Sequence, residues 1–217
     1  MTLSASGGRL SWGGARNRAA RTSDALTLRQ ARGITAAAQF ALALGFPLNR
    51  HLTVHWARAG IDDAGAAAAT RALLKRASQS LAKRGEPFAY IWIRENDSDG
   101  KGSHVHLLLH VPPGAARRFT TLQRRWIRHV TGKPYRVNTL HTSRIGGTVN
   151  AAESMPDKYR ANLQNVVAYV LKGAEPVAAQ VLGLTKLEAG GRVIGKRCGW
   201  SENIGAAARG RAASSGA

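Results

Sequence analysis

The chain has 217 residues, 44% of them hydrophobic and 20% charged, which is enough for one core of ordinary size. It carries 32 Lys and Arg against 12 Asp and Glu, a formal net charge of +20. This excess argues against an enzyme of small metabolites. It favours nucleic acid as the partner, ahead of an anionic membrane surface. The single cysteine, Cys198, excludes a disulfide within the sequence and a zinc site built from cysteines.

Composition predicts one folded domain between two basic tails. We expect residues 1–24 to form a disordered basic arm, although a transit peptide has a similar composition. The domain then covers 25–175, and 176–217 form a basic extension that is partly disordered. Residues 31–172 alone hold 21 basic and 8 acidic residues, so the positive charge belongs to the domain itself. The longest apolar run, 36–48, is 13 residues, short of the roughly 18 that span a membrane. We therefore expect a cytoplasmic protein.

Hydrophobic periodicity predicts alternating helices and strands in the first half of the domain. Helices are expected over 26–44 and from Asp62 or Asp63 to about Arg84, and strands over 50–56, 88–95 and 104–111. The polar, glycine-containing loop 96–102 is short. It makes the second and third strands an antiparallel hairpin.

The second half of the domain adds two long helices and one strand. The helix 115–130 has an apolar side and a basic side, a strand is expected over 135–142, and a last helix runs from 155 to Lys172. The whole plan is α+β, with an antiparallel central sheet and flanking helices.

Two histidines and a glutamate are the strongest candidates for metal ligands. His104 and His106 are two residues apart on one strand, so their side chains share a face of the sheet. Glu95 ends the preceding strand and returns beside them across the hairpin. Two imidazoles and a carboxylate suit Mg²⁺, Mn²⁺ or Zn²⁺. The simpler interpretation of a lone His-x-His pair is a half-exposed polar face.

The motif Tyr169-Val-Leu-Lys172 is the second candidate. Its spacing on a helix brings the phenol and the ammonium to one side, at the edge of the apolar stripe. Asn162 and Asn165 lie on the same side. Taken alone, this pattern also fits an ordinary packing tyrosine.

The order of these motifs resembles the HUH endonucleases, and among them the single-tyrosine initiators of rolling-circle replication in plasmids and phages. The resemblance covers residues 48–173: His51-Leu-Thr-Val-His-Trp56, then Glu95 and the His104-Val-His106 strand, then Tyr169-x-x-Lys172. The chain departs from the family at His51 and His55, where hydrophobic residues are more common. No segment resembles a helicase domain, so a host helicase becomes a candidate partner.

The resemblance implies a metal-dependent enzyme that nicks and rejoins single-stranded or hairpin DNA. Mg²⁺ or Mn²⁺ on Glu95, His104 and His106 would polarise the scissile phosphate. Tyr169 would attack it and form a 5′-phosphotyrosine, and Lys172 would stabilise charge or help to position the metal. A related transposase or mobilisation nuclease would use the same chemistry.

The basic side of helix 115–130 is a candidate for contacts with the DNA backbone. Between residues 115 and 136 the chain has seven basic residues and no acidic one. The predicted contacts are Arg117, Arg118, Arg124, Arg125 and Arg128. A solvated helix face is the alternative. The rival hypothesis is a protein without enzymatic activity: a basic nucleic-acid-binding protein whose histidine pair is structural.

Overall fold

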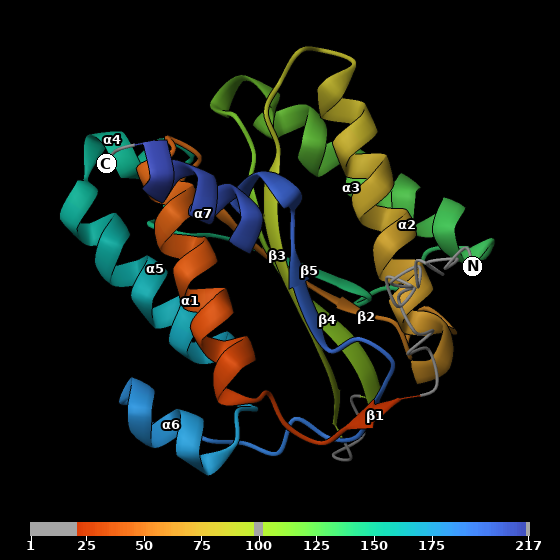
Figure 1. Ribbon diagram of the computed structural model, residues 1–217. Coiled ribbons are helices and arrows are strands. Elements are labelled where there is room, and N and C mark those ends of the chain that lie inside the picture. Colours follow the sequence, from red (N-terminus) through yellow and green to blue (C-terminus); the bar gives the residue numbers. More distant parts are fainter. Residues whose placement is uncertain (1–20, 98–101, 216–217) are drawn as a thin grey trace, which may run out of the picture.

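The computed structural model describes residues 21–97 and 102–215. A five-stranded antiparallel sheet lies between two layers of helices (Figure 1), which confirms the predicted α+β class. The strand order is β5-β2-β4-β3-β7. The strands are β2 (Arg50–His55), β3 (Ala89–Asp97), β4 (Gly102–His110), β5 (Leu140–Arg144) and β7 (Cys198–Trp200).

Two long helices cover each face of the sheet (Figure 1). One layer contains α1 (Leu28–Ala43) and α5 (Pro156–Val170), and the other contains α2 (Asp63–Ala82) and α3 (Ala116–Thr131). Helix α2 begins where the sequence predicts, because the Asp62 side chain accepts a hydrogen bond from the Gly65 amide at 2.8 Å. The remaining helices are α4 (Ala151–Ser154), α6 (Pro176–Leu182), α7 (Ala206–Ser215) and the 3₁₀ turns Pro113–Ala115 and Glu202–Ile204.

Alternation along the strands decides which residues face which layer. In β4, Val105, Leu107 and Leu109 belong to the apolar cluster beneath α2 and α3. The alternate residue Leu108 belongs to the cluster beneath α1 and α5. His104 and His106 therefore lie on the α1/α5 face. The pairing register sets Glu95 of β3 directly opposite His104, as the expected hairpin requires.

Segments from near both ends of the described chain lie together at one edge of the fold. Strand β1 (Thr22–Ser23) pairs with β6 (Val193–Ile194), and β7 pairs with β3. The extension 176–217 thus supplies an edge strand of the central sheet and, in α7, a helix where disorder was expected. Of the predicted disordered arm, residues 1–20 lie outside the described residues, as do 98–101 of the hairpin loop. Within the described residues, no helix has both the length and the apolar character needed to cross a bilayer.

Candidate metal centre and tyrosine site

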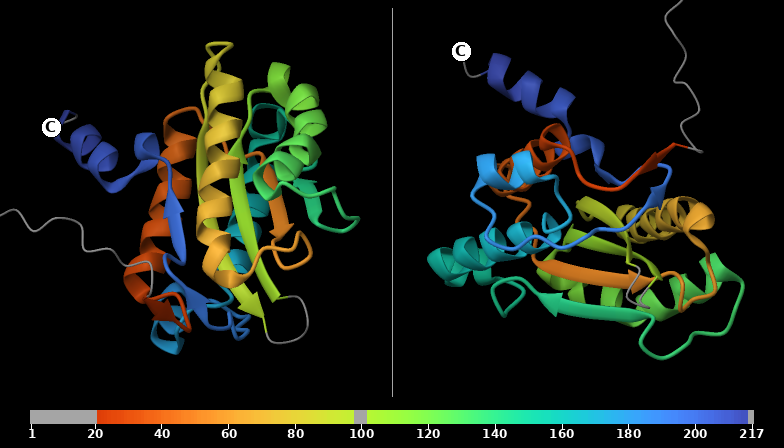
Figure 2. Two further views of the ribbon diagram at one scale, coloured as in Figure 1. Left: turned by 90° about the vertical axis from the view of Figure 1, so that its right-hand side faces the viewer. Right: turned by 90° about the horizontal axis from the view of Figure 1, so that it is seen from below.

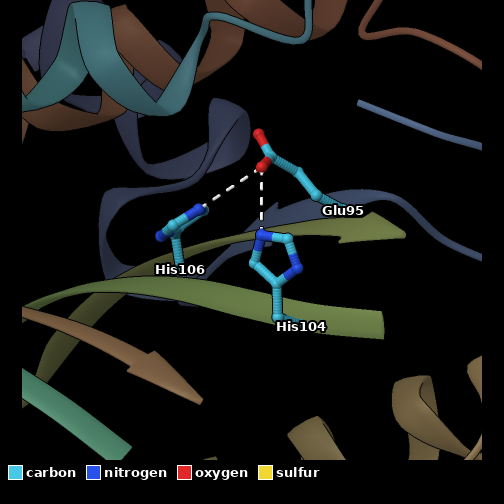
Figure 3. A group of neighbouring side chains, drawn as sticks. All are labelled: Glu95, His104 and His106. Atoms are coloured by element: carbon cyan, nitrogen blue, oxygen red, sulfur yellow. Dashed lines mark hydrogen bonds and ion pairs between the residues drawn. The ribbon is translucent and has the colours of Figure 1, made fainter. Parts of the chain in front are cut away.

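Glu95, His104 and His106 converge on one point of the α1/α5 face (Figure 3). The Oε2 atom of Glu95 lies 3.1 Å from Nε2 of His104 and 3.5 Å from Nε2 of His106. All three side chains are buried, with at most 4% of each residue exposed. Among the described residues, this is the one group of three or more His, Cys, Asp or Glu side chains close enough to share an ion.

The donor atoms fit a divalent metal ion. Two imidazole nitrogens and a carboxylate oxygen are common ligands of such ions. Two further observations point the same way: Oε1 of Glu95 and Nε2 of His106 are buried, and neither makes a hydrogen bond. Buried polar atoms without a partner are costly, and a bound cation would satisfy both. The cluster can therefore hold a metal ion.

Hydrogen bonds on the far side of each imidazole hold the two rings in place. Nδ1 of His104 donates to the carbonyl of Gly102 at 2.9 Å, which leaves Nε2 as the ligand atom. Nδ1 of His106 lies 3.0 Å from the Thr53 hydroxyl and 3.2 Å from Nε2 of His51. Strand β2 thus supports the His106 ligand through two side chains.

The charges in the cluster favour the protonation states that a metal requires. Burial acts to raise the pKa of Glu95, but the close contacts with His104 and His106 and the positive charge of Lys172 outweigh it and hold that pKa well below its usual range. Burial lowers the pKa of His106, despite the nearby Glu95. A carboxylate and a neutral imidazole are the ligand forms of these residues.

His51 is also neutral at physiological pH. Burial, reinforced by the neighbouring His106 and His141, lowers the pKa of His51 to about 3. Its ring lies 5.3 Å from the His106 ring and 5.9 Å from the Tyr169 ring, between centroids. His51 therefore contacts both the candidate metal centre and the candidate nucleophile.

Tyr169 lies in the last turn of α5, at the open side of the cluster. The residue is 41% exposed, and its ring centroid lies 5.5 Å from that of His106. The Tyr169 side chain is thus partly open to solvent while its ring borders His106 of the cluster.

Lys172 follows α5 and links the tyrosine to the cluster. Its Nζ lies 3.2 Å from Oε2 of Glu95, 2.6 Å from Oε2 of Glu188, and 5.4 Å from the Tyr169 ring centroid. Burial opposes the charge of this ammonium, but the two carboxylates outweigh burial and raise the pKa of Lys172. A fixed positive charge therefore sits between Glu95 and Tyr169.

Another tyrosine of the same helix has a different role. Tyr159 is 1% exposed, and its hydroxyl donates to the carbonyl of Leu48 at 3.1 Å. Burial raises the pKa of the Tyr159 phenol further from neutrality. This buried, hydrogen-bonded side chain fixes α5 against the sheet and leaves Tyr169 as the accessible tyrosine of α5.

The predicted DNA-binding arginines lie on the other side of the molecule. Arg117, Arg118, Arg124, Arg125 and Arg128 are all exposed on α3, which covers the opposite face of the sheet from the cluster. All of them except Arg124 border hollows on that layer, and one hollow, of about 310 Å³, is also lined by Arg76 and Lys83 of α2. The structure therefore does not bring these arginines together with the candidate metal centre.

Sequence reasoning missed three residues that contact the site. His51 and Thr53 alternate along β2 with Leu52 and Val54, and their signal is this polar period of two. Glu188 lies in an irregular segment and has no comparable signal. Comparison with known proteins adds nothing to this list, since no family model, curated protein or solved structure matches the chain.

Proposed function

We propose that the protein is a metal-dependent endonuclease that nicks and rejoins single-stranded DNA through a covalent bond to Tyr169. One observation carries the proposal: an exposed tyrosine ring borders a buried Glu–His–His cluster that can hold a metal ion, and Lys172 reaches both. The resemblance of the three motifs to HUH endonucleases supports it, as does the net charge of +20, which suits a polyanionic substrate.

Glu95, His104 and His106 would hold the ion, with Mg²⁺ or Mn²⁺ as the expected metals. When bound, such an ion supplies Lewis-acid polarisation of a phosphate oxygen. His51 and Thr53 would keep the His106 ring turned toward the ion through its Nδ1 atom.

Tyr169 would act as the nucleophile. Its phenolic oxygen forms a bond to phosphorus, the bond from phosphorus to the 3′ oxygen breaks, and the phenol loses its proton while the 3′ oxygen gains one. The products are a 5′-phosphotyrosine and a free 3′-hydroxyl. Because the tyrosyl ester keeps the phosphodiester bond energy, the reverse attack by a 3′-hydroxyl rejoins the strand.

Lys172 would offset negative charge that develops on the phosphate or on the phenol. Its ammonium is already fixed by Glu95 and Glu188, so little reorganisation is needed during the reaction. Rolling-circle initiation is the biological role we favour. A transposase or mobilisation nuclease shares this chemistry, and the DNA next to the gene, an origin-like hairpin or mobile-element ends, separates the two.

The deciding experiment is to incubate the protein with stem-loop single-stranded DNA and Mn²⁺ and to look for a covalent adduct on a denaturing gel. We expect the wild type to form the adduct and Tyr169→Phe to lose it entirely, because one hydroxyl is removed while the ring and its packing remain. Tyr135→Phe is the matched control, since Tyr135 is half-buried beside Arg124, on the α3 side. It should keep forming the adduct.

Two outcomes would contradict the proposal. If Tyr169→Phe still forms the adduct, the nucleophile is another residue. If the wild type forms none on any stem-loop with Mg²⁺ or Mn²⁺, the protein is better explained as a nucleic-acid-binding protein with a structural histidine pair.

A further inference from the structure

A groove of about 850 Å³ lies between residues 21–33 and residues 195–209. Its walls come from the segment that leads into α1, from β7 with the turn before it, and from the start of α7. Helix α7 stands away from the body of the protein and has no buried residue (Figure 2). The groove therefore belongs to the extension 176–217 and to residues 21–33, and lies outside the site formed by Glu95, His104, His106 and Tyr169.

The lining of this groove is cationic. Five basic residues line it and no acidic residue does: Arg21, Arg29, Lys196, Arg197 and Arg209. The side chains of Arg21 and Arg29 form no hydrogen bond or ion pair with any other described residue. Carboxylates, Asp24 among them, lie near Arg197. Elsewhere in the lining the like charges repel one another, and an anionic ligand would relieve that repulsion. The ligand expected here is therefore an anion of several charges.

One aromatic side chain in the lining, Trp200, favours a nucleic-acid strand over a polyanion without bases. Trp200 lines the groove, and the guanidinium of Arg209 lies 5.6 Å from the centroid of its ring. Gly33 makes room for this indole, since a Cβ on Gly33 would stand 2.5 Å from a ring carbon of Trp200. Grooves that combine cations with aromatic and guanidinium planes bind single strands, because phosphates meet the charges and bases stack on the planes.

Arg197 connects the groove to the candidate metal centre. It lines the groove, is 2% exposed, and donates to the carbonyls of Gly190 at 3.3 Å and Gly191 at 2.5 Å. Gly190 in turn lies against Gly173, the residue that follows Lys172. One short backbone segment thus separates the groove from the residues around Tyr169.

We propose that this groove binds single-stranded nucleic acid, as the path for the strand that flanks the phosphodiester at Tyr169. The inference rests on the proposed function, and it adds a second contact surface made by the extension. Binding to the groove needs no cleavage, so it is tested in a Tyr169→Phe background. An error in the groove assignment then appears as unchanged DNA binding, whereas an error in the proposed chemistry appears only in the adduct assay.

The test measures fluorescence anisotropy of a labelled oligothymidylate over a range of salt concentrations. Arg21→Ala/Arg29→Ala removes two charges and no hydrogen bond between described residues. We expect weaker binding and a salt slope smaller by about 1.4, since each lost single-strand phosphate contact lowers it by about 0.7. The matched control is Arg71→Ala/Lys75→Ala, which removes the same charge from exposed positions of α2, across the sheet. It should keep the wild-type slope.

Three results would overturn the inference. The first is an unchanged slope in the groove variant, and the second is an equal loss in the control, which would show a general charge effect. The third comes from competition with inorganic polyphosphate. Polyphosphate and an unlabelled oligonucleotide are each used to displace the labelled oligonucleotide. If both are equally effective, the bases contribute nothing to affinity, and the groove is a site for polyanions in general.

Discussion

The two faces of the central sheet use the same strands for different purposes. On the α2/α3 face, β2 and β4 present mostly apolar side chains, such as Leu52, Val54 and Leu107, with Arg50 and Ser103 as polar exceptions. On the α1/α5 face, the alternate positions of those strands carry His51, Thr53, His104, His106 and, from β3, Glu95. Burying apolar groups stabilises the fold, whereas burying polar groups costs free energy unless they are paired. Both faces bury apolar clusters and so contribute to stability, but only the α1/α5 face also carries the candidate site. A period of two is enough to separate the polar residues of that site from Leu52, Val54 and Leu107.

The largest effect that tests this division is expected at the metal ligands. His104→Ala or His106→Ala removes one of three donors, so Mn²⁺ affinity should fall by more than about 100-fold. This exceeds the 10–100-fold loss that is typical when a residue that only hydrogen-bonds a ligand is removed. Mn²⁺-dependent cleavage should fall with it. Calorimetry measures the Mn²⁺ affinity, and the adduct assay measures cleavage. DNA binding should survive. If the double variant His104→Ala/His106→Ala cleaves DNA as well as the wild type, these two residues are not the metal ligands.

The converse substitution lies one residue away on the same strand. Leu107 is 1% exposed in the apolar cluster under α2 and α3. Leu107→Ala should lower the free energy of unfolding by about 2–5 kcal/mol, through lost burial and the cavity left behind. Denaturant unfolding measures this loss. At temperatures where the variant is folded, its Mn²⁺ affinity should match the wild type; a parallel loss of metal binding would show that the two faces are coupled.

A smaller effect is expected at His51, which supports His106 without being one of the three ligands. His51→Leu removes one hydrogen-bonding partner of Nδ1, and Mn²⁺ affinity should fall about 10–100-fold. Since the pKa of His51 is near 3, this residue stays neutral over the neutral range, and the loss should not vary with pH there. His129→Leu, an exposed change on α3, is the control. A wild-type affinity in His51→Leu would leave Thr53 as the sole support.

The smallest effect concerns the basic helix on the apolar face. Replacing Arg117, Arg124 and Arg128 by Ala should weaken DNA binding at all sequences alike and reduce the salt slope by up to about 0.7 for each lost single-strand contact. Mn²⁺ affinity should not change, because the sheet separates α3 from the cluster. An unchanged slope would mean that this helix face is merely solvated.

Local patterns were sufficient to predict most of the central fold and the clustering of Glu95, His104 and His106. A short loop between two apolar strands predicts a hairpin, and the hairpin predicts Glu95 beside His104. Strand β7 was beyond prediction, since three residues carry no periodicity and its pairing with β3 joins distant segments. The support of His106 by β2 was missed for a related reason. It depends on β2 lying next to β4, and strand order is set by packing of the whole chain.

The late position of β7 in the chain also bears on how the protein folds as it is made. Ile91 and Ile93 of β3 pair with Trp200 and Cys198, so this edge of the sheet stays bare until residues about 100 positions later have left the ribosome. Closing so long a loop is slow compared with forming the β3–β4 hairpin. In the interval, an apolar strand with unpaired backbone groups is exposed to other nascent chains, and such an edge promotes aggregation. Newly synthesised protein should therefore depend on chaperones until residues 198–200 pair with β3.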